Sequence, residues 1–188
     1  MSIHETPTKT ETNTATKTLW SHFTAGEHVQ YYLRDQLRSA IPNNWTEELY
    51  PHITILPGYT VPESVADEAA ALTEHIGAAH VGTEVPVDDV YCFHPLNSDN
   101  PTFVVAIEIG MNLNGIRHRQ AAQLTNFSGE PTLEPKRPHI TLFKSGDSGE
   151  NHDPLTPTQR ENIRTAIDSL TVPDTIHISD MHVEECTY

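Results

Sequence analysis

The sequence predicts an α+β fold in which one strand–helix–strand–helix–strand unit occurs twice. Two observations lead to this prediction. Apolar residues follow the order of such a unit along residues 19–93 and again along residues 102–183, and a string that begins Pro-His-Ile-Thr stands at equivalent places in both. A duplication of this length predicts a bilobal domain, with two mainly antiparallel sheets around a central cleft and helices on the outside. We expect lobe one to span about residues 19–100 and lobe two about residues 101–188 of this single domain.

Residues 1–18 are expected to form a flexible arm that precedes this domain. Threonine occupies every second position from Thr6 to Thr18, with charged or small residues between. A period of two would also suit an edge strand, but the stretch has no apolar face that could dock one. Its low-complexity composition is typical of disorder.

Apolar spacing and helix-ending residues define the five elements of the first unit. Strands are expected where apolar residues form short runs, and helices where they recur every three or four positions. Prolines, glycines and capping sequences set the helix ends. In order, the elements are a strand at 19–23, a helix with Val29, Leu33, Leu37 and Ile41 before Pro42, a strand at 49–56, a helix opened by a capping box at 60–63 and ended at Gly77, and a strand at 83–93.

The second unit repeats this order with the same kinds of signal. A β-branched strand is followed by a helix that stops near a glycine, and a later Thr-Pro-Thr-Gln sequence opens the last helix. In order, the elements are a strand at 102–109, a helix from Leu113 to Phe127 before Gly129, a strand at 137–143, a helix from Thr156 with Ile163, Ile167 and Leu170 on one face, and a strand at 175–183.

The charge of the chain restricts the class of partner. It has 26 Asp and Glu against 11 Lys and Arg, a net charge of −15, and a pI near 5.0. Such a surface repels polyphosphate, so we expect no long duplex nucleic acid as a partner. No apolar run approaches the ~18 residues of a membrane helix, so we expect no membrane partner.

Cysteine content and acidity indicate a cellular environment. Two cysteines without metal-ligand spacing predict a reducing, cytoplasmic location and no metal site. High acidity with many threonines is typical of a halophilic archaeon or its virus, because molar salt screens the repulsion between surface carboxylates. An ordinary acidic mesophilic protein is the alternative.

One string is repeated almost unchanged between the two units. Residues 51–56 read Pro-His-Ile-Thr-Ile-Leu, and residues 138–143, 87 positions later, read Pro-His-Ile-Thr-Leu-Phe. The bare pattern His-x-Thr is weak, since about 1.4 copies are expected by chance, and we interpret a third copy, His22-Phe23-Thr24, as such a match. The longer Pro-His-Ile-Thr string has a chance expectation of about 0.007, so its two copies indicate a function.

Strand geometry explains why these residue types are useful together. Residues i and i+2 share a face, so His52 projects with Thr54 and His139 with Thr141, while the isoleucine between them enters the core. A pseudo-two-fold arrangement would bring both pairs to one cleft. Two imidazoles on opposite sides of a phosphorus atom can serve as general base and general acid, and the hydroxyls can donate to phosphoryl oxygens.

These residues resemble the 2H phosphoesterase superfamily, which is named for two His-x-Thr motifs and includes 2′-5′ RNA ligase-like proteins and RNA 2′,3′-cyclic phosphodiesterases. The resemblance covers about residues 19–185. It implies a bilobal fold, a central groove and metal-independent cleavage of phosphodiesters that involve a ribose 2′-oxygen. It also implies that His52 and Thr54 form the first catalytic motif and His139 and Thr141 the second. His52 would protonate the leaving oxygen and His139 would activate water, or the two roles could be reversed.

Further substrate-binding residues follow from the same parity argument. Tyr50 shares the strand face of the first motif, and Arg137 and Phe143 share that of the second. Arg137 or Lys144 can contact phosphate, and Tyr50 or Phe143 can stack a base. Some members of the resembled family have a basic residue three positions after the second threonine, where this chain has Lys144. The remaining basic cluster, Arg117-His118-Arg119, has two interpretations, a phosphate-binding patch and a solvated helix face, and we favour the solvated face.

Three hypotheses of function remain open from the sequence. The first is an enzyme without a cofactor that cleaves 2′,3′-cyclic phosphates or 2′-5′ phosphodiester bonds of small RNA-derived nucleotides or RNA ends. The second is a non-catalytic nucleotide- or RNA-binding module whose histidines only bind phosphate. The third is a subunit of a virion or complex, which the threonine-rich arm would favour. Intact motifs favour the enzyme over the binding module, and we expect a monomer.

Overall fold

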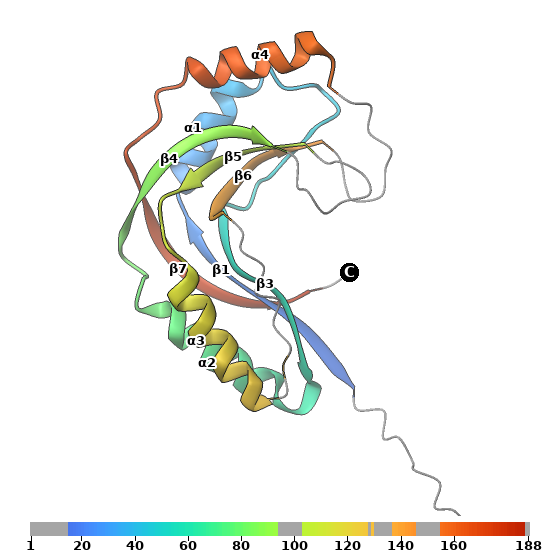
Figure 1. Ribbon diagram of the computed structural model, residues 1–188, viewed down its shortest axis with the longest axis vertical. Coiled ribbons are helices and arrows are strands. Elements are labelled where there is room, and N and C mark those ends of the chain that lie inside the picture. Colours follow the sequence, from blue (N-terminus) through green and yellow to red (C-terminus); the bar gives the residue numbers. More distant parts are fainter. Residues whose placement is uncertain (1–14, 94–102, 128, 130–136, 146–154, 187–188) are drawn as a thin grey trace, which may run out of the picture.

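The computed structural model describes residues 15–93, 103–127, 129, 137–145 and 155–186. Within these residues, seven antiparallel strands form one sheet in the order β2-β6-β5-β4-β7-β1-β3, and four α-helices pack against it (Figure 1). The predicted α+β class is confirmed. The strands are β1 (Thr16–Ala25), β2 (Thr46–Glu47), β3 (His52–Pro62), β4 (Glu84–Phe93), β5 (Val104–Ile109), β6 (His139–Lys144) and β7 (Thr175–Glu185). The helices are α1 (Glu27–Leu37), α2 (Ala66–Ala78), α3 (Asn114–Leu124) and α4 (Pro157–Asp168), with 3₁₀ turns at Glu63–Val65 and Thr125–Phe127.

The expectation of two sheets in a bilobal unit is wrong, because β4 and β7 join the strands into one sheet. Residues 84–86 of β4 pair with residues 175–177 of β7. Beyond this short ladder the strands separate, β4 continuing along β5 from Val87 and β7 along β1 from Ile178. Apolar periodicity does not encode which strands pair, so the sequence pattern could not reveal the junction. The described residues show no second sheet and no bilobal unit.

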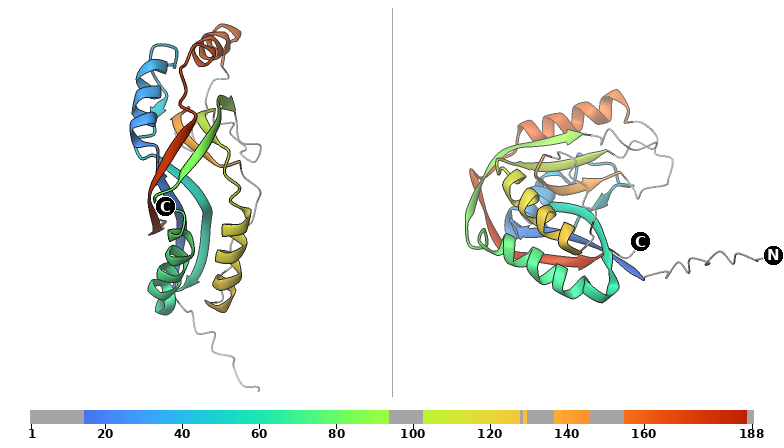
Figure 2. Two further views of the ribbon diagram at one scale, coloured as in Figure 1. Left: turned by 90° about the vertical axis from the view of Figure 1, so that its left-hand side faces the viewer. Right: turned by 60° about the horizontal axis from the view of Figure 1, so that its bottom comes forward.

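Each pair of helices combines one helix from each half of the chain. α1 packs against β6 and α4, and α4 packs against β4. α2 and α3 pack against each other, with α2 on β7 and β1 and α3 on β3. Figures 1 and 2 show α1 and α4 together at one end of the molecule and α2 and α3 at the other. In the described part of the chain, none of these helices is long and apolar enough to cross a membrane.

The predicted start of the last helix at Thr156 is confirmed, and a capping box forms there. Thr156 Oγ1 accepts from the backbone N–H of Gln159 (3.2 Å), and Gln159 Oε1 accepts from the backbone N–H of Thr156 (2.9 Å), which caps α4. The capping box expected at residues 60–63 is wrong, because Thr60 lies in β3 and α2 begins at Ala66. Pairing of Thr60 with Thr18 of β1 overrides the local helix signal there.

β1 begins earlier than the apolar pattern indicated. Residues 16–18, which the sequence assigned to the arm, pair with residues 60–62 of β3. The backbone N–H of Glu63 also donates to the carbonyl of Ala15 (2.9 Å). Backbone hydrogen bonds need no apolar side chains, so the hydropathy pattern could not predict this extension of β1. Residues 1–14 of the expected arm lie outside the described residues.

The core fixes the two motif strands from one face. Ile53 and Ile55 of β3 and Ile140 and Leu142 of β6 are fully buried and belong to one apolar cluster. Burying a side chain of this size contributes about 1.5–3 kcal/mol to folding. The cluster therefore anchors the backbone of both motifs, and the motif histidines and threonines project from the opposite face.

Candidate active site

The two motif strands present the same residue types in the same way. His52 and Thr54 at the start of β3 are half-buried, and so are His139 and Thr141 at the start of β6. The residues between them are fully buried. The alternation expected from strand geometry is therefore present in both motifs.

An extra residue follows each motif threonine. On β3, Thr54 and Leu56 pair with consecutive residues of β1, so Ile55 between them is a β-bulge. On β6, Thr141 and Phe143 pair with consecutive residues of β5, so Leu142 between them is a β-bulge as well. The two bulges are 87 residues apart, as the motifs are. A bulge reverses the face on which the following side chain lies.

Phe143 is therefore not available to stack a base, and that prediction is wrong. Simple alternation along β6 predicts Phe143 on the same face as His139. The bulge at Leu142 turns the Phe143 ring to the opposite face. Phe143 is 0% exposed and belongs to the main apolar cluster. Its counterpart after the first bulge, Leu56, is fully buried too.

Both motif histidines are oriented by the same backbone hydrogen bond. His52 Nδ1–H donates to the carbonyl of Tyr50 (3.0 Å), and His139 Nδ1–H donates to the carbonyl of Arg137 (2.9 Å). A carbonyl only accepts, so Nδ1 carries the proton in each ring. The basic lone pair of the neutral imidazole then lies on Nε2, which is the position needed for proton transfer to or from a substrate.

The residue that supplies each carbonyl is itself held by the neighbouring strand. The Tyr50 hydroxyl forms hydrogen bonds with His22 Nε2 (3.0 Å) and Thr24 Oγ1 (3.1 Å). In the second motif, Arg137 Nη1 donates to Glu108 Oε1 (3.1 Å). Thr24 pairs with His52 and Glu108 pairs with His139 in the sheet. The two motifs thus share a layout of supporting bonds, built from different side chains.

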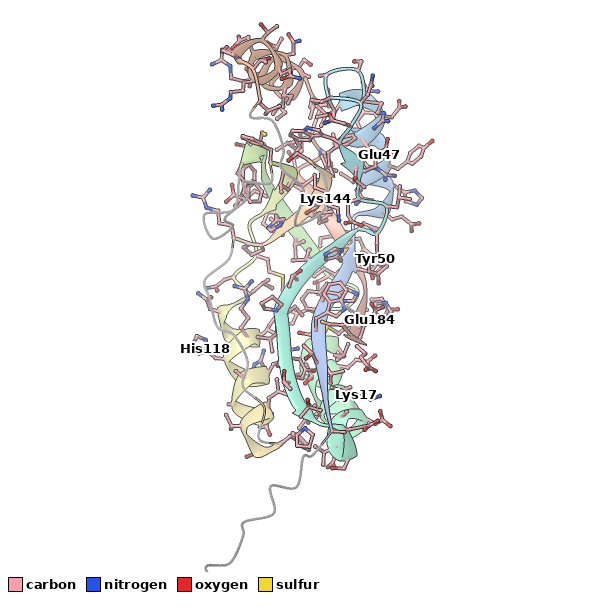
Figure 3. The ribbon with its side chains drawn as sticks, turned by 90° about the vertical axis from the view of Figure 1, so that its right-hand side faces the viewer. Lys17, Glu47, Tyr50, His118, Lys144 and Glu184 are labelled. Carbon is pink, nitrogen blue, oxygen red and sulfur yellow. The ribbon has the colours of Figure 1, made fainter. Side chains whose placement is uncertain are left out.

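Lys144, a predicted phosphate contact, is linked to Tyr50 through Glu48. Lys144 Nζ lies 3.8 Å from Glu48 Oε2, and Glu48 Oε1 accepts from the backbone N–H of Tyr50 (3.2 Å). Figure 3 shows Lys144 and Tyr50 close together along the same side of the molecule. The structure therefore brings these two predicted residues together, next to the first motif.

His22, which the sequence treated as a chance match, lies beside the first motif. It pairs with Thr54 in the sheet and is 0% exposed. Its ring stacks on Trp20, with centroids 3.9 Å apart, and meets the ring of His52 at 5.7 Å. Burial, together with His52 and His182 nearby, lowers the pKa of His22 from 6.5 to about 3. His22 is therefore neutral at physiological pH and serves as a fixed hydrogen-bond partner of Tyr50.

Replacing His22 by glutamine is expected to make the stability less sensitive to acid. The unfolded chain binds a proton at His22 below pH 6.5, whereas the folded protein does so only near pH 3. Stability present above pH 6.5 is therefore lost as the pH falls through this window. By about pH 4 the loss is about 2 kcal/mol, allowing for partial screening by solvent.

Urea unfolding at about pH 7 and about pH 4.5 measures this effect as the change in unfolding free energy. The His22→Gln variant should lose less stability than the wild type between the two pH values. His75→Gln, a change on the exposed face of α2, is the control and should behave as the wild type. An equal acid sensitivity in wild type and His22→Gln would contradict a buried neutral imidazole.

One cavity brings residues of both motifs together. Thr54 comes from the first motif and His139 from the second. His52 contacts Trp20, one of the residues that line this cavity. The two rings meet edge to face, with centroids 5.1 Å apart. The cavity has a volume of about 200 Å³ and is lined by Trp20, Thr54, Pro57, Arg117, Arg137 and His139.

The predicted site residues divide into three groups by their position. Thr54, His139 and Arg137 line the cavity. Phe143 lies in the core. The remaining ones lie on the motif strands or next to them and are not among the described lining residues of the cavity: His52, Thr141, Tyr50 and Lys144.

The favoured interpretation of Arg117 as part of a solvated helix face is wrong. Arg117 is 7% exposed and lines the cavity. Its Nε donates to the carbonyl of Ile55 (2.8 Å), and burial lowers its pKa. Helical periodicity could have found it, because position 117 is four residues after Leu113 and three before Gln120, both on the buried face of α3.

Aromatic rings that sequence reasoning left without a role lie against the motif histidines. Trp20 meets His52, and Phe93 meets His139 edge-on with ring centroids 5.4 Å apart. Phe93 also stacks with Tyr91 at 4.9 Å. The Trp20 contact depends on the pairing of β1 with β3, and the Phe93 contact on the pairing of β4, β5 and β6. No local pattern in the sequence reveals either pairing.

A second cavity, elsewhere in the described part of the chain, is separate from the motif residues. A larger cavity of about 440 Å³ lies between β4 and α4, and its lining contains none of the four motif histidines and threonines. Among the described residues, no group of three or more His, Cys, Asp or Glu side chains is placed to share a metal ion.

Two His-x-Thr motifs are the feature for which the 2H phosphoesterases are named, and this chain carries both on antiparallel strands of one sheet. A comparison with known families matches residues 22–174 to the 2′-5′ RNA ligase superfamily. The matched stretch includes both motifs and most of the chain, so the protein belongs to this superfamily. The resemblance inferred from the motifs is confirmed.

Two solved structures similar to this chain are of Usb1 from Kluyveromyces marxianus. The first is 10% identical, with a TM-score of 0.47, and the similarity covers 81% of each chain. The second contains Usb1 with uridine monophosphate; it is 9% identical, with a TM-score of 0.42, and covers 81% of this chain and 80% of that one. Among curated proteins, none matches this sequence.

Proposed function

We propose that the protein is a metal-independent phosphodiesterase that cleaves 2′,3′-cyclic phosphate or 2′-5′ phosphodiester bonds of small RNA-derived nucleotides. The observation that carries this proposal is the matched orientation of the two histidines. Each donates Nδ1–H to the carbonyl two residues before it, so each directs Nε2 to the substrate side. Membership of the 2′-5′ RNA ligase superfamily supports the class of bond.

In the proposed reaction the two histidines divide the proton transfers. One accepts a proton from water as the water oxygen forms a bond to phosphorus. The other donates a proton to the leaving ribose oxygen as the bond between that oxygen and phosphorus breaks. By resemblance to the cyclic phosphodiesterases, His139 is the base and His52 the acid. The backbone carbonyl on Nδ1 would stabilise the imidazolium form that the acid needs before the reaction and the base acquires during it.

Thr54 and Thr141 would stabilise the negative charge that develops on the non-bridging phosphoryl oxygens. A hydroxyl that donates to a non-bridging phosphoryl oxygen acts most strongly when that oxygen gains charge in the transition state. Thr54 lies in the same cavity as His139, which supports a role for this hydroxyl at the phosphorus that His139 serves.

A small substrate fits the charge of the molecule better than a long one. A surface with a net charge of −15 repels long polyanions, whereas one phosphodiester needs only local positive charge. Arg137 lines the cavity and Lys144 lies beside Tyr50. Tyr50 beside His52 and Phe93 beside His139 are the proposed contacts for bases, because aromatic rings stack on any base.

The test is an assay of EDTA-treated protein on three kinds of substrate: 2′,3′-cyclic nucleotides, 2′-5′ dinucleotides and 3′-5′ dinucleotides. We expect turnover of at least one of the first two and little of the third. Running the assay in low salt and in molar KCl also tests whether the protein is adapted to high salt.

Each alternative hypothesis predicts a different result of this assay. Activity that EDTA abolishes and a divalent metal restores would contradict the two-histidine mechanism. Tight binding of nucleotides without turnover would favour a non-catalytic binding module. Neither binding nor turnover would favour the hypothesis of a subunit in a virion or complex.

A further inference from the structure

Arg117 and Gln30 occupy equivalent positions in the two halves of the chain. Gln30 lies on α1 and Arg117 on α3, 87 residues later, the same interval as between the motifs. Gln30 Nε2 donates to the carbonyl of Thr141 (3.0 Å), and Arg117 Nη2 donates to the carbonyl of Thr54 (3.4 Å). Each helix therefore supports the motif threonine of the opposite half of the sequence.

The hydrogen bond from the helix to the carbonyl of the motif threonine does not require a charged side chain. At position 30 a neutral amide, 1% exposed, holds the second motif strand at its bulge. At position 117 the same task is done by an arginine that is 7% exposed. The equivalent position in the other half of the molecule works without a charge, so the hydrogen bond to the motif strand does not by itself explain an arginine here.

The position of Arg117 indicates the anion that it serves. Arg117 lines the cavity that also contains Thr54 and His139, one residue from each motif. Arg137 shares this cavity, but its side chain is 73% exposed, and its guanidinium bonds to the carboxylate of Glu108. Arg117 thus shares a cavity with one residue of each motif, where the proposed reaction would place the phosphoryl group.

We propose that Arg117 binds the phosphoryl group of the substrate in this cavity. The inference rests on the proposed function and adds the residue that recognises the phosphate. The planar guanidinium can donate to phosphoryl oxygens in a fixed geometry, and a site with little water strengthens such a bond. Arg117 also holds the carbonyls of Thr54 and Ile55, so it ties the bound phosphate to the first motif strand.

The test replaces Arg117 by glutamine, the residue that the first half of the chain uses at the same place. Glutamine can keep a carbonyl hydrogen bond but carries no charge. The matched control is Arg119→Gln, which removes the same charge from an exposed position two residues further along α3. Binding of adenosine 3′-monophosphate is measured by calorimetry in a His139→Ala background, so that the readout does not depend on turnover.

We expect Arg117→Gln to weaken this binding about tenfold or more and Arg119→Gln to change it less than about twofold. Arg117→Lys should restore part of the affinity, because it returns the charge without the planar fork. Equal affinity in Arg117→Gln and its parent would overturn the proposal. If binding depends on Arg117 but the wild-type protein turns over none of the substrates, this inference is supported and the proposed enzymatic function is contradicted.

A second measurement covers the case in which Arg117→Gln does not fold. The Nε–H resonance of Arg117 in the wild-type protein is followed by NMR during titration with inorganic phosphate and with adenosine 3′-monophosphate. We expect this resonance to shift with a saturating dependence on the ligand, and that of Arg119 to stay in place. No shift at Arg117, while another part of the protein responds, would overturn the proposal.

Discussion

Replacing either motif histidine by alanine is expected to lower turnover by at least about 10²-fold, the lower end of what a general acid or base contributes. His52→Ala removes the proposed proton donor to the leaving oxygen, and His139→Ala removes the proposed acceptor from water. The backbone carbonyls of Tyr50 and Arg137 orient the rings from behind, so each substitution removes an imidazole whose position is already fixed. Turnover of the best substrate under saturating conditions is the measurement.

The pH dependence adds a readout that a structural role would not produce. A general acid and a general base together give a bell-shaped profile of kcat/KM, and loss of one histidine should remove one limb of it. The limb that disappears in each variant decides which histidine is the acid. The double variant should be little worse than either single one, because both act in the same step.

His118→Ala is the control for these substitutions. His118 is exposed on α3 and points away from Tyr50 and the motif strands (Figure 3). Its removal should leave turnover within about twofold of the wild type, as expected for a surface change remote from the site. Unchanged turnover in His52→Ala or His139→Ala would exclude the two-histidine mechanism.

The motif and its strand context could be predicted because their signals are local. Pro-His-Ile-Thr is a contiguous string, and the alternation that exposes His52 and Thr54 while burying Ile53 spans three residues. The start of α4 could be predicted for the same reason, since Thr156 and Gln159 cap it through their own neighbours. Local patterns of this kind depend little on where the rest of the chain lies.

The features that could not be predicted depend on residues far apart in the sequence. The bulge at Leu142 is defined by the pairing of β6 with β5. Alternation along β6 alone therefore predicts the wrong face for Phe143. The junction of β4 with β7 joins strands that are about 90 residues apart, and it made one sheet from two expected ones. His22 gained its place beside the first motif through β1 and β3.

The duplication is retained in the backbone and changed in the side chains. The bulges, the histidine–carbonyl bonds and the helix-to-threonine bonds recur in both halves. Around His52 the neighbours are a neutral histidine and aromatic rings, whereas Arg137, bonded to Glu108, stands next to His139. One reaction needs an acid and a base at the same pH, and different neighbours around equivalent histidines are a means to obtain both.

Phe143→Ala is expected to lower the free energy of unfolding by about 3–4 kcal/mol, the usual cost of truncating a fully buried phenylalanine. The ring lies in the main apolar cluster together with Ile140 and Leu142, so its loss leaves a cavity behind the second motif strand. Urea unfolding monitored by circular dichroism gives the change in free energy from the midpoint and slope. The variant Phe143→Leu, which removes less of the side chain than alanine does and stays apolar, should cost less, about 1.5 kcal/mol.

The same two variants separate a core residue from a base-stacking one. If Phe143 only packs in the core, KM per folded molecule stays within about twofold in Phe143→Leu, because no atom of the substrate loses a contact. A stacking role would give the reverse result: a stability close to that of the wild type and a large rise in KM for every base, since stacking is worth about 1–3 kcal/mol per base. The burial of Phe143 behind the bulge favours the first outcome.

The KM measurement also tests the register of β5 with β6. The bulge decides which face of β6 the Phe143 ring occupies, and the placement of Thr141 depends on the same register.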